Sequence, residues 1–336
     1  MNVAMWGKAL QVIPRVSKEE WDRLDIVCRW LIATRSAVLI ITFISAALAG
    51  IFAASVGKFD PLLWLLLTAG LIMAHATNNL LNDVVDHRRG LDKDNYFRAQ
   101  YGAHPLEHGL MSLRDELTYA AVTGLIALAA GAYLVYLRGP LAVVLLALGA
   151  FFVLFYTYPL KYIGLGELAV LVVWGPLMIG GGFFVITGQW DWAITWAGLP
   201  YAFGVTSIIF GKHIDKHDAD RAKGIHTLPV LIGEKPARYV NLSLMIGQYV
   251  LVLALVAVRF FTPVMLAVLV ILPTLWLVIG VYRQSKPATM PEGYRDDVWP
   301  SWFVAFAFYH NRRFGLVFLL ALIGDLIARS LGIFPT

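Results

Sequence analysis

The chain has 336 residues, of which 59% are hydrophobic and only 15% are charged. A soluble domain carries about 25% charged residues, so this composition argues against an ordinary soluble protein. The single cysteine, Cys28, excludes intrachain disulfides and cysteine-rich metal sites. The net charge of +5 would be compatible with nucleic-acid binding, but the positions of the basic residues favour a membrane explanation.

The N-terminal part of the chain shows no short apolar core followed by a small-residue cleavage site, so no signal peptide is predicted. Residues 17–30 predict an amphipathic helix that lies at the membrane interface. Ser17 or Lys18 would open this helix, and Trp21 and Trp30 suit the headgroup level. We therefore expect a cytoplasmic N-terminal segment over residues 1–34 and a membrane domain over residues 35–336.

Apolar runs long enough to cross about 30 Å of hydrocarbon recur along the rest of the chain. They predict an all-α fold, a polytopic membrane helix bundle with nine transmembrane helices. The two largest charged loops each follow an even-numbered helix, which suggests two four-helix pseudo-repeats with the ninth helix left over. The expected spans are 36–56, 62–82, 116–136, 139–157, 166–187, 192–211, 239–258, 262–282 and 314–333.

The distribution of lysine and arginine sets the expected orientation. With the N-terminus inside, 23 of the 27 basic residues lie in inside segments, as the positive-inside rule predicts. This bias accounts for the net charge, so we expect no nucleic-acid partner. The protein is expected to be an integral, multi-pass protein of a prokaryotic cell membrane. Its cytoplasmic loops would be 83–114, 212–238 and the aromatic-rich 283–313.

Polar residues gather where the second predicted span ends. If this stretch is helical, His75, Asn79, Asn82 and Asp86 follow one another at steps of three or four and share a face. Asp83 and Asp86 are three apart, so both carboxylates can converge on one ion. Carboxylate and amide oxygens suit Mg²⁺, which keeps some waters and shares further positions with phosphate oxygens. The alternative interpretation is a solvated, acidic helix end.

A second acidic cluster follows the sixth predicted span. Asp215 and Asp218 would point the same way from a helix, whereas Asp220 would point nearly opposite Asp215 unless the helix has ended. Bases are interleaved with the acids of both loops, which suits a metal-bridged phosphate: the acids hold the metal and the bases hold the remaining oxygens. Charge balancing in a solvated loop is the alternative. The bases are Lys212, Lys216, Arg221 and Lys223 in the second loop, and Arg88, Arg89 and Lys93 in the first.

The two clusters resemble the motifs of the UbiA superfamily of intramembrane prenyltransferases. Asn82-Asp-Val-Val-Asp86 followed by Asp92 resembles the first Asp-rich motif, with a spacing most similar to that of 1,4-dihydroxy-2-naphthoate polyprenyltransferases. The stretch from Asp220 to Val230 resembles the end of the second motif, with Lys216 at the place of its first Asp. Further similar segments are Tyr156–Lys161, Gly164–Glu167 and 174–177. The resemblance covers about residues 30–280 and does not extend to residues 283–313.

This resemblance implies Mg²⁺-dependent transfer of a polyprenyl group from its diphosphate to a small lipophilic acceptor, expected to be an aromatic quinone precursor as in menaquinone biosynthesis. The aromatic faces of Tyr156 and Tyr158 would stabilise the carbocation, although interfacial anchoring explains these two tyrosines equally well. Catalytic roles fall to Asn82, Asp83, Asp86, Asp215 and Asp220. Metal binding falls to Asp83, Asp86, Asp92, Asp215, Asp218 and Asp220. Substrate binding falls to Asn79, Arg88, Lys93, Tyr156, Tyr158, Lys161, Lys212, Lys216, Arg221 and Lys223.

Three other functions fit parts of the same pattern. A membrane terpene cyclase would use the same diphosphate site with no acceptor, and a related transferase would act on a non-aromatic lipid or polyene. A secondary transporter would share an internal repeat and polar helix ends. The acids here cluster at helix ends among lysines and arginines, whereas a coupling-ion site should lie near the membrane midplane. The transporter is therefore the less favoured class.

Overall fold

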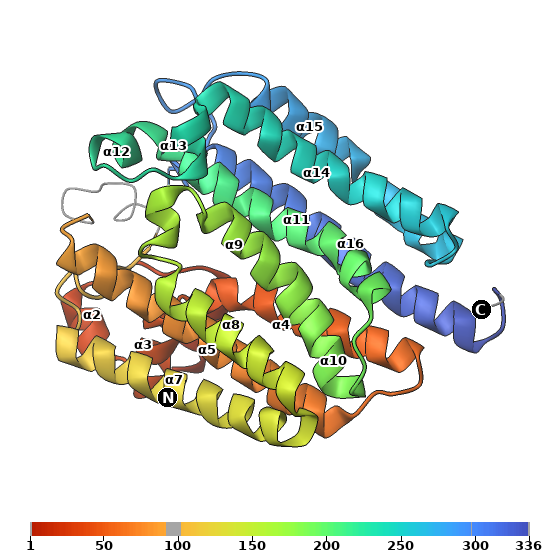
Figure 1. The fold of residues 1–336 in the computed structure, drawn as a ribbon. Coiled ribbons are helices and arrows are strands. Elements are labelled where there is room, and N and C mark those ends of the chain that lie inside the picture. The colour runs from red at the N-terminus through yellow and green to blue at the C-terminus, as the bar shows by residue number, and fades with distance from the viewer. Residues whose placement is uncertain (1, 92–101, 297, 335–336) are drawn as a thin grey trace.

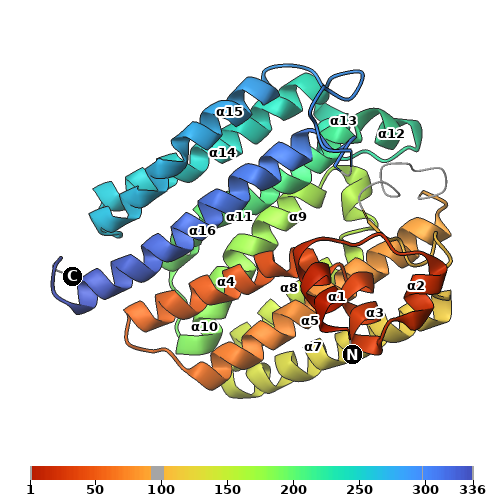
Figure 2. The ribbon, with the colours of Figure 1, turned by 180° about the vertical axis from the view of Figure 1, so that it is seen from behind.

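The computed structural model describes residues 2–91, 102–296 and 298–334, and every regular element within these ranges is a helix (Figure 1). This confirms the predicted all-α fold. Three short helices precede the bundle: α1 (Val3–Gln11), α2 (Lys18–Arg23) and α3 (Ile26–Ala33). They lie against the ends of α4 (Ser36–Ser55) and α5 (Pro61–Arg88), as the view from behind shows (Figure 2).

The predicted interfacial helix over residues 17–30 is two helices in the structure. Ser17 opens the first, where its hydroxyl accepts from the N–H of Glu20 and the Glu20 carboxylate accepts from the N–H of Ser17. Asp25 opens the second by accepting from the N–H of Cys28 at 2.9 Å, so the chain turns between them. Trp21, expected at the headgroup level, is only 2% exposed and packs inside the N-terminal part.

The first half of the bundle continues with α7 (Leu113–Arg138) and α8 (Pro140–Phe155). Asp60 caps the start of α5, and Ser112 with Asp115 forms a capping box at the start of α7. Because α5 runs on to Arg88, the first acidic motif lies within its last turns rather than in a loop. The described residues beyond α5 include a turn-rich segment, 102–112, that leads into α7.

The second half begins after the short helix η1 (Leu160–Ile163). A single continuous span comprises α9 (Gly166–Val172), η2 (Val173–Gly180) and α10 (Gly181–Thr187). Its middle part is a π-helix that contains Pro176, which has no N–H to donate to the ladder. The remaining helices are α11 (Trp192–Asp215), α12 (His217–Ala222), α13 (Leu228–Ile232), α14 (Glu234–Ala257), η3 (Pro263–Ile271), α15 (Leu272–Tyr282) and α16 (Phe303–Ser330).

Seven helical segments of the described chain are long and apolar enough to cross a membrane. Each of the nine predicted spans coincides with a helix, but α8 has only 16 residues and α16 carries four charged side chains. The count of nine crossings therefore stays a prediction, as does the internal repeat. The helix α16 also begins at Phe303 rather than near residue 314, so the last eleven residues of the predicted loop 283–313 are helical.

Both acidic motifs lie at one end of the bundle. The C-terminal end of α5, the helices α12 and α13, and the segment between α15 and α16 gather there, whereas the C-terminal end of α16 lies at the opposite end (Figure 1). At that opposite end, Asp325 accepts from the N–H of Thr262 at 2.6 Å and from Arg329 Nε at 2.8 Å. This buried acid therefore ties α16 to the start of η3, and no site role is needed to explain it.

The main apolar core packs α4, α11, α14 and α16 against one another. Tyr201, Met245 and Phe314 are fully buried in it, and the Tyr201 hydroxyl donates to the carbonyl of Ile41 at 3.0 Å. Small residues bring other helices close: a Cβ at Gly182 would lie 2.9 Å from the Cβ of Ala49. Close backbone approach of this kind drives helix association where lipid surrounds the protein. Together these contacts fix the helices that carry the polar end.

Candidate active site

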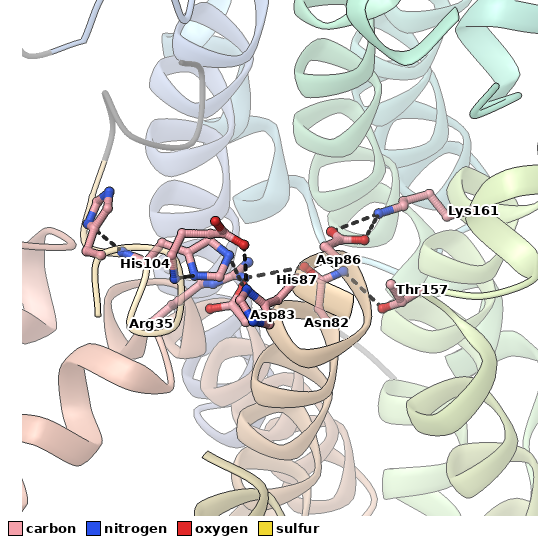
Figure 3. Close-up of polar contacts among 10 residues, drawn as sticks. Arg35, Asn82, Asp83, Asp86, His87, His104, Thr157 and Lys161 are labelled. Carbon is pink, nitrogen blue, oxygen red and sulfur yellow. Dashed lines mark hydrogen bonds and ion pairs between the residues drawn. The ribbon is translucent and has the colours of Figure 1, made fainter. Parts of the chain in front are cut away.

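The first motif presents its polar side chains from the last turns of α5 (Figure 3). Asn82 Nδ2 donates to Thr157 Oγ1 at 2.9 Å, and Asn82 Oδ1 accepts from Arg35 at 3.3 Å. Asp83 is 1% exposed and pairs with Arg35. His104 Nε2 lies 3.9 Å from the Asp83 carboxylate. The motif is therefore an ordered, buried network rather than a solvated helix end.

Arg35 is a site residue that the sequence analysis did not single out. It lies between α3 and α4 with φ of 56°, a left-handed conformation that is uncommon for a residue with a side chain. Strain of this kind persists where surrounding contacts over-determine it, and here the ion pair with Asp83 does so. Its place directly after the predicted N-terminal segment was the only available signal, because the partner acid is far away in the chain.

Asp86 pairs with a lysine from η1, the short helix between the two halves of the bundle. Lys161 Nζ lies 3.0 Å from both Asp86 oxygens, and η1 holds this lysine next to the start of α9. Burial raises the pKa of the nearby Tyr162 hydroxyl to about 12, and the carboxylates of Asp86 and Asp220 contribute to this rise. Tyr162 thus lies within electrostatic reach of an acid from each motif.

The second motif contributes Asp220 from α12. Asp220 is only 3% exposed, and its carboxylate lies 3.4 Å from Lys216 Nζ. Lys223 donates to the backbone carbonyl of Leu91, so the second loop is tied directly to the end of the first motif. Asp83, Asp86 and Asp220 therefore each have a basic partner at the same end of the bundle, as the interleaved charges of the sequence suggested.

Asp215, expected as a metal ligand, has a different role in the structure. Its Oδ2 accepts from the N–H groups of Trp302 and Val304 at 2.9 and 3.0 Å, and its Oδ1 accepts from that of Phe303 at 3.0 Å. Lys286 Nζ lies 3.7 Å away. The carboxylate thus caps the N-terminus of α16, where unpaired N–H groups and the helix dipole favour an anion. We revise the expectation accordingly: Asp215 anchors α16 to the end of α11.

Several other expected residues lie away from the buried network. The Asp218 side chain is 99% exposed and pairs with His217, because it projects from α12 on the side opposite Asp220. Arg221 and Arg88 are exposed. Tyr158 is half exposed and stacks under Arg89, whose guanidinium carbon lies 3.6 Å from the ring centroid. Asp92 and Lys93 lie outside the described residues.

A cavity of about 1480 Å³ opens beside this polar end and extends into the apolar interior. Asn79, whose Nδ2 donates to the carbonyl of Thr34 at 2.8 Å, lines its polar part. The opposite wall is apolar and comes from α5, α7, α8, α9 and α10. From Asn82 to Leu67 on α5 the cavity is about 22 Å deep at 1.5 Å per residue. Expected residues that line it also include Asn82, Tyr156, Lys161, Lys212, Asp215 and Lys216.

The segment between α15 and α16 forms one wall of the cavity. Tyr294, Arg295 and Val298 line it, and the Tyr294 hydroxyl donates to the carbonyl of Ser301 at 2.6 Å. The rings of Trp299 and Trp302 pack around Tyr294. The sequence showed an aromatic-rich loop here without a role. The capping bonds to Asp215 join this wall to the end of α11, and no local sequence pattern reveals them.

The donor set suits a magnesium ion that is shared with phosphate. Among the described residues, no three His, Cys, Asp or Glu side chains gather as a complete protein ligand set. Mg²⁺ at phosphate sites commonly takes one or two carboxylates and completes its shell with phosphate oxygens and water. Asp83 and Asp86 lie one turn apart on α5, with the Asn82 amide beside them and Lys161 paired with Asp86. This arrangement fits such a shared site and does not fit a closed metal cage.

The comparison with protein families is decisive. Residues 43–292 match the model of the UbiA prenyltransferase family. The chain belongs to this family. The match includes α5, η1, α9, α11 and α12, the helices that carry the polar network, and it confirms the resemblance found in the sequence.

Individual UbiA proteins are distant from this chain. A UbiA prenyltransferase domain-containing protein 1 homolog of Drosophila melanogaster is 28% identical over 64% of this chain, and the matched part spans only 59% of that relative. The 1,4-dihydroxy-2-naphthoate octaprenyltransferase of Escherichia coli is 27% identical, over 66% of this chain and 74% of its own length. A solved UbiA homolog from Archaeoglobus fulgidus, bound to GPP and Mg²⁺, superposes with a TM-score of 0.56 at 15% identity, covering 88% and 99% of the two chains. The structural match confirms the UbiA fold.

Proposed function

We propose that this UbiA protein transfers a polyprenyl group from its diphosphate to an aromatic acceptor, with Mg²⁺ bound at the polar end of the cavity. The observation that carries the proposal is the juxtaposition of three acid–base pairs, formed by Asp83, Asp86 and Asp220, with an apolar cavity of about 1480 Å³. A diphosphate with a hydrocarbon tail has this same division into one highly charged end and one apolar end.

The two motifs support separate tasks at the charged end. Asp83 and Asp86, with Asn82, would hold Mg²⁺, which supplies positive charge to the leaving diphosphate when it is bound. Lys161 and Lys216 are placed to donate to the remaining diphosphate oxygens, since both line the cavity and lie beside the acids. Asp220 holds Lys216 in this position and is available to a second cation. Preorganised charge of this kind stabilises the negative charge that develops as the allylic C–O bond breaks.

The apolar part of the cavity supports the other half of the reaction. Its walls exclude water from the allylic carbocation, which water would otherwise capture. The Tyr156 ring lines the cavity close to the polar end, where an aromatic face stabilises a cation. Gly149 lines the apolar part, and a Cβ there would meet no atom within 4 Å, which leaves room for a long prenyl chain. The expected role of Tyr158 is not favoured, because that ring lies outside the cavity beneath Arg89.

An aromatic quinone precursor is the acceptor class we favour. Support comes from the similarity to the E. coli naphthoate octaprenyltransferase and from the match of the first motif to that type of spacing. We also propose that the polar end faces the cytoplasm of a prokaryotic cell, because the basic residues concentrate in the segments at that end. The acceptor would then enter from the cytoplasmic side or laterally from the lipid.

The proposal is tested by product analysis with the purified full-length protein in lipid nanodiscs. Prenyl diphosphates of several lengths are incubated with Mg²⁺ and a panel of acceptors: hydroxynaphthoates, hydroxybenzoates, glycerol phosphates and no acceptor. We expect a prenylated aromatic product that disappears when Mg²⁺ is chelated. A cyclic hydrocarbon formed without acceptor would indicate a terpene cyclase instead, and a prenylated glycerol phosphate would indicate a lipid-forming transferase. Absence of any diphosphate release would contradict all three.

A further inference from the structure

A buried histidine–glutamate pair lies at the polar end of the cavity and has no part in the metal and diphosphate chemistry described above. His213 Nδ1 lies 2.6 Å from Glu167 Oε1, which joins α11 to α9. The two residues are only 3% and 1% exposed. The second Glu167 oxygen accepts from the N–H of Leu228 at 3.4 Å, so the start of α13 also holds the carboxylate. Glu167 therefore holds the imidazole of His213, and the bond from Leu228 holds Glu167.

The other ring nitrogen of His213 is available to a ligand. His213 lines the cavity, and within the described chain its side chain makes no hydrogen bond besides that with Glu167. A carboxylate at Nδ1 favours the tautomer with hydrogen on Nδ1, so Nε2 keeps its lone pair. The same division of roles, with a carboxylate orienting a histidine whose second nitrogen moves the proton, recurs in unrelated enzymes.

The other buried histidines of the membrane helices have different partners. His75 also lines the cavity, but its Nδ1 lies 2.7 Å from the hydroxyl of Thr42. His310 lies 2.9 Å from the Tyr249 hydroxyl within the core and away from the cavity. Neither has a carboxylate partner. A histidine that only fills space or satisfies a core hydrogen bond needs none, so His213 differs from them in having a carboxylate that fixes its tautomer and would stabilise an imidazolium.

The pair lies next to the reacting end of the prenyl diphosphate site. A Cβ at Gly166, the residue before Glu167, would lie 3.8 Å from Cε2 of Tyr156, whose ring lines the cavity. The same Cβ would lie 3.3 Å from the Cα of Lys161, the lysine that pairs with Asp86. An acceptor positioned against the allylic carbon would therefore have His213 on its side of the cavity.

We propose that Nε2 of His213 is the base that removes the proton lost by the acceptor, and that Glu167 is its positioning residue. This inference rests on the proposed prenyl transfer. The C–O bond between the allylic carbon and the diphosphate breaks, and its electron pair leaves with the diphosphate. A carbon of the hydroxylated aromatic ring forms the new C–C bond to the allylic carbon. The proton that the ring gives up to regain aromaticity passes to Nε2, and the Glu167 carboxylate stabilises the resulting imidazolium.

The test separates proton removal from diphosphate ionisation. Full-length wild type, His213→Gln and Glu167→Gln are given a labelled prenyl diphosphate, Mg²⁺ and the acceptor, and prenylated product, free prenyl alcohol and released diphosphate are measured together. We expect His213→Gln to lower product formation about 100-fold, the usual contribution of a general base, while diphosphate release continues and prenyl alcohol accumulates. Glu167→Gln should lower product formation at least about tenfold, with the same shift toward the alcohol.

His75→Gln is the matched control, because it changes another cavity histidine of the same size and should leave the ratio of product to alcohol unchanged. Adding imidazole to His213→Gly should restore part of the transfer, which a purely structural role would not allow. Equal losses of product and diphosphate release in His213→Gln, or retention of full transfer, would overturn the inference. If the wild-type protein releases no diphosphate, the proposed function itself is refuted. The measurement of released diphosphate in the wild type therefore distinguishes this outcome from failure of the His213 inference.

Discussion

Lys161 Nζ lies 3.0 Å from each carboxylate oxygen of Asp86, although 75 residues separate the two in the chain. The pair is buried where the two halves of the bundle meet. An isolated buried pair contributes little net stability, because desolvation offsets most of the attraction. Because Lys161 lines the cavity, we favour a functional explanation, in which the lysine would bind diphosphate oxygens and the carboxylate would bind the metal.

Replacing Lys161 should weaken use of the diphosphate. We expect Lys161→Gln to lower kcat/KM for the prenyl diphosphate about 100-fold, because one charge-assisted contact to the leaving group is lost. Lys161→Arg should retain more activity, since the charge remains. Steady-state kinetics on folded protein in nanodiscs measure this effect, with Lys235→Gln, an exposed lysine of α14, as the control. Equal activity of Lys161→Gln and the control would show that Lys161 only balances Asp86.

The first motif should be indispensable. Asp83→Asn and Asp86→Asn should each lower turnover at least about 100-fold, because each removes a carboxylate that, in the proposed function, would hold the metal-bound diphosphate. Asp218→Asn, with its side chain in solvent, should cost at most about tenfold. Turnover of the three variants at saturating Mg²⁺ measures the difference. If Asp218→Asn proved the most damaging, the solvent-facing acid would have to be a ligand.

Substitutions of Asp215 and of Asp220 should affect different properties of the protein. Asp220→Ala should raise the Mg²⁺ concentration needed for half-maximal turnover, because this carboxylate pairs with Lys216, which lines the cavity beside the proposed diphosphate site. Asp215→Asn should leave that concentration unchanged and lower the stability by about 1–3 kcal/mol, since the amide cannot accept all three bonds that cap α16. Mg²⁺ titration of turnover and thermal unfolding of both variants separate the two roles. A raised Mg²⁺ requirement in Asp215→Asn would instead show that Asp215 is a metal ligand.

Much of the fold follows from local sequence, because apolar runs and caps such as Ser17 and Ser112 are local signals. The motif around Asp83 and Asp86 was equally recognisable. The role of Asp215 was not, because its partners lie 87 to 89 residues further along the chain. Helical spacing paired it with Asp218, whereas the helix ends at Asp215 and α12 turns Asp218 into solvent. Contacts of this range depend on tertiary packing that no spacing rule encodes.

The apolar end of the cavity should set the length of the prenyl chain. Gly149 on α8 lines the cavity, and a Cβ there would meet no atom within 4 Å. Gly149→Leu would therefore fill space that a long chain needs. We expect activity with C20 relative to C10 diphosphate to fall about tenfold, equivalent to about 1.4 kcal/mol of steric exclusion.

Gly280→Leu is the control for this change. Gly280 on α15 is also open on its Cβ side, but it does not line the cavity, so its replacement should leave the chain-length preference unchanged. The same shift in both variants would point to a general effect on the bundle. No shift in Gly149→Leu would place the prenyl chain along another wall.

The most direct measurement is binding of a non-ionisable prenyl thiolodiphosphate to the purified protein, by calorimetry, with and without Mg²⁺. If both motifs bind one metal-bound diphosphate, the wild-type protein should bind the analogue tightly only with Mg²⁺. Asp86→Asn and Asp220→Ala should each weaken this binding at least about tenfold, or about 1.4 kcal/mol. Binding that is equally tight in the presence of a chelator, or unaffected by either substitution, would contradict a shared metal–diphosphate site.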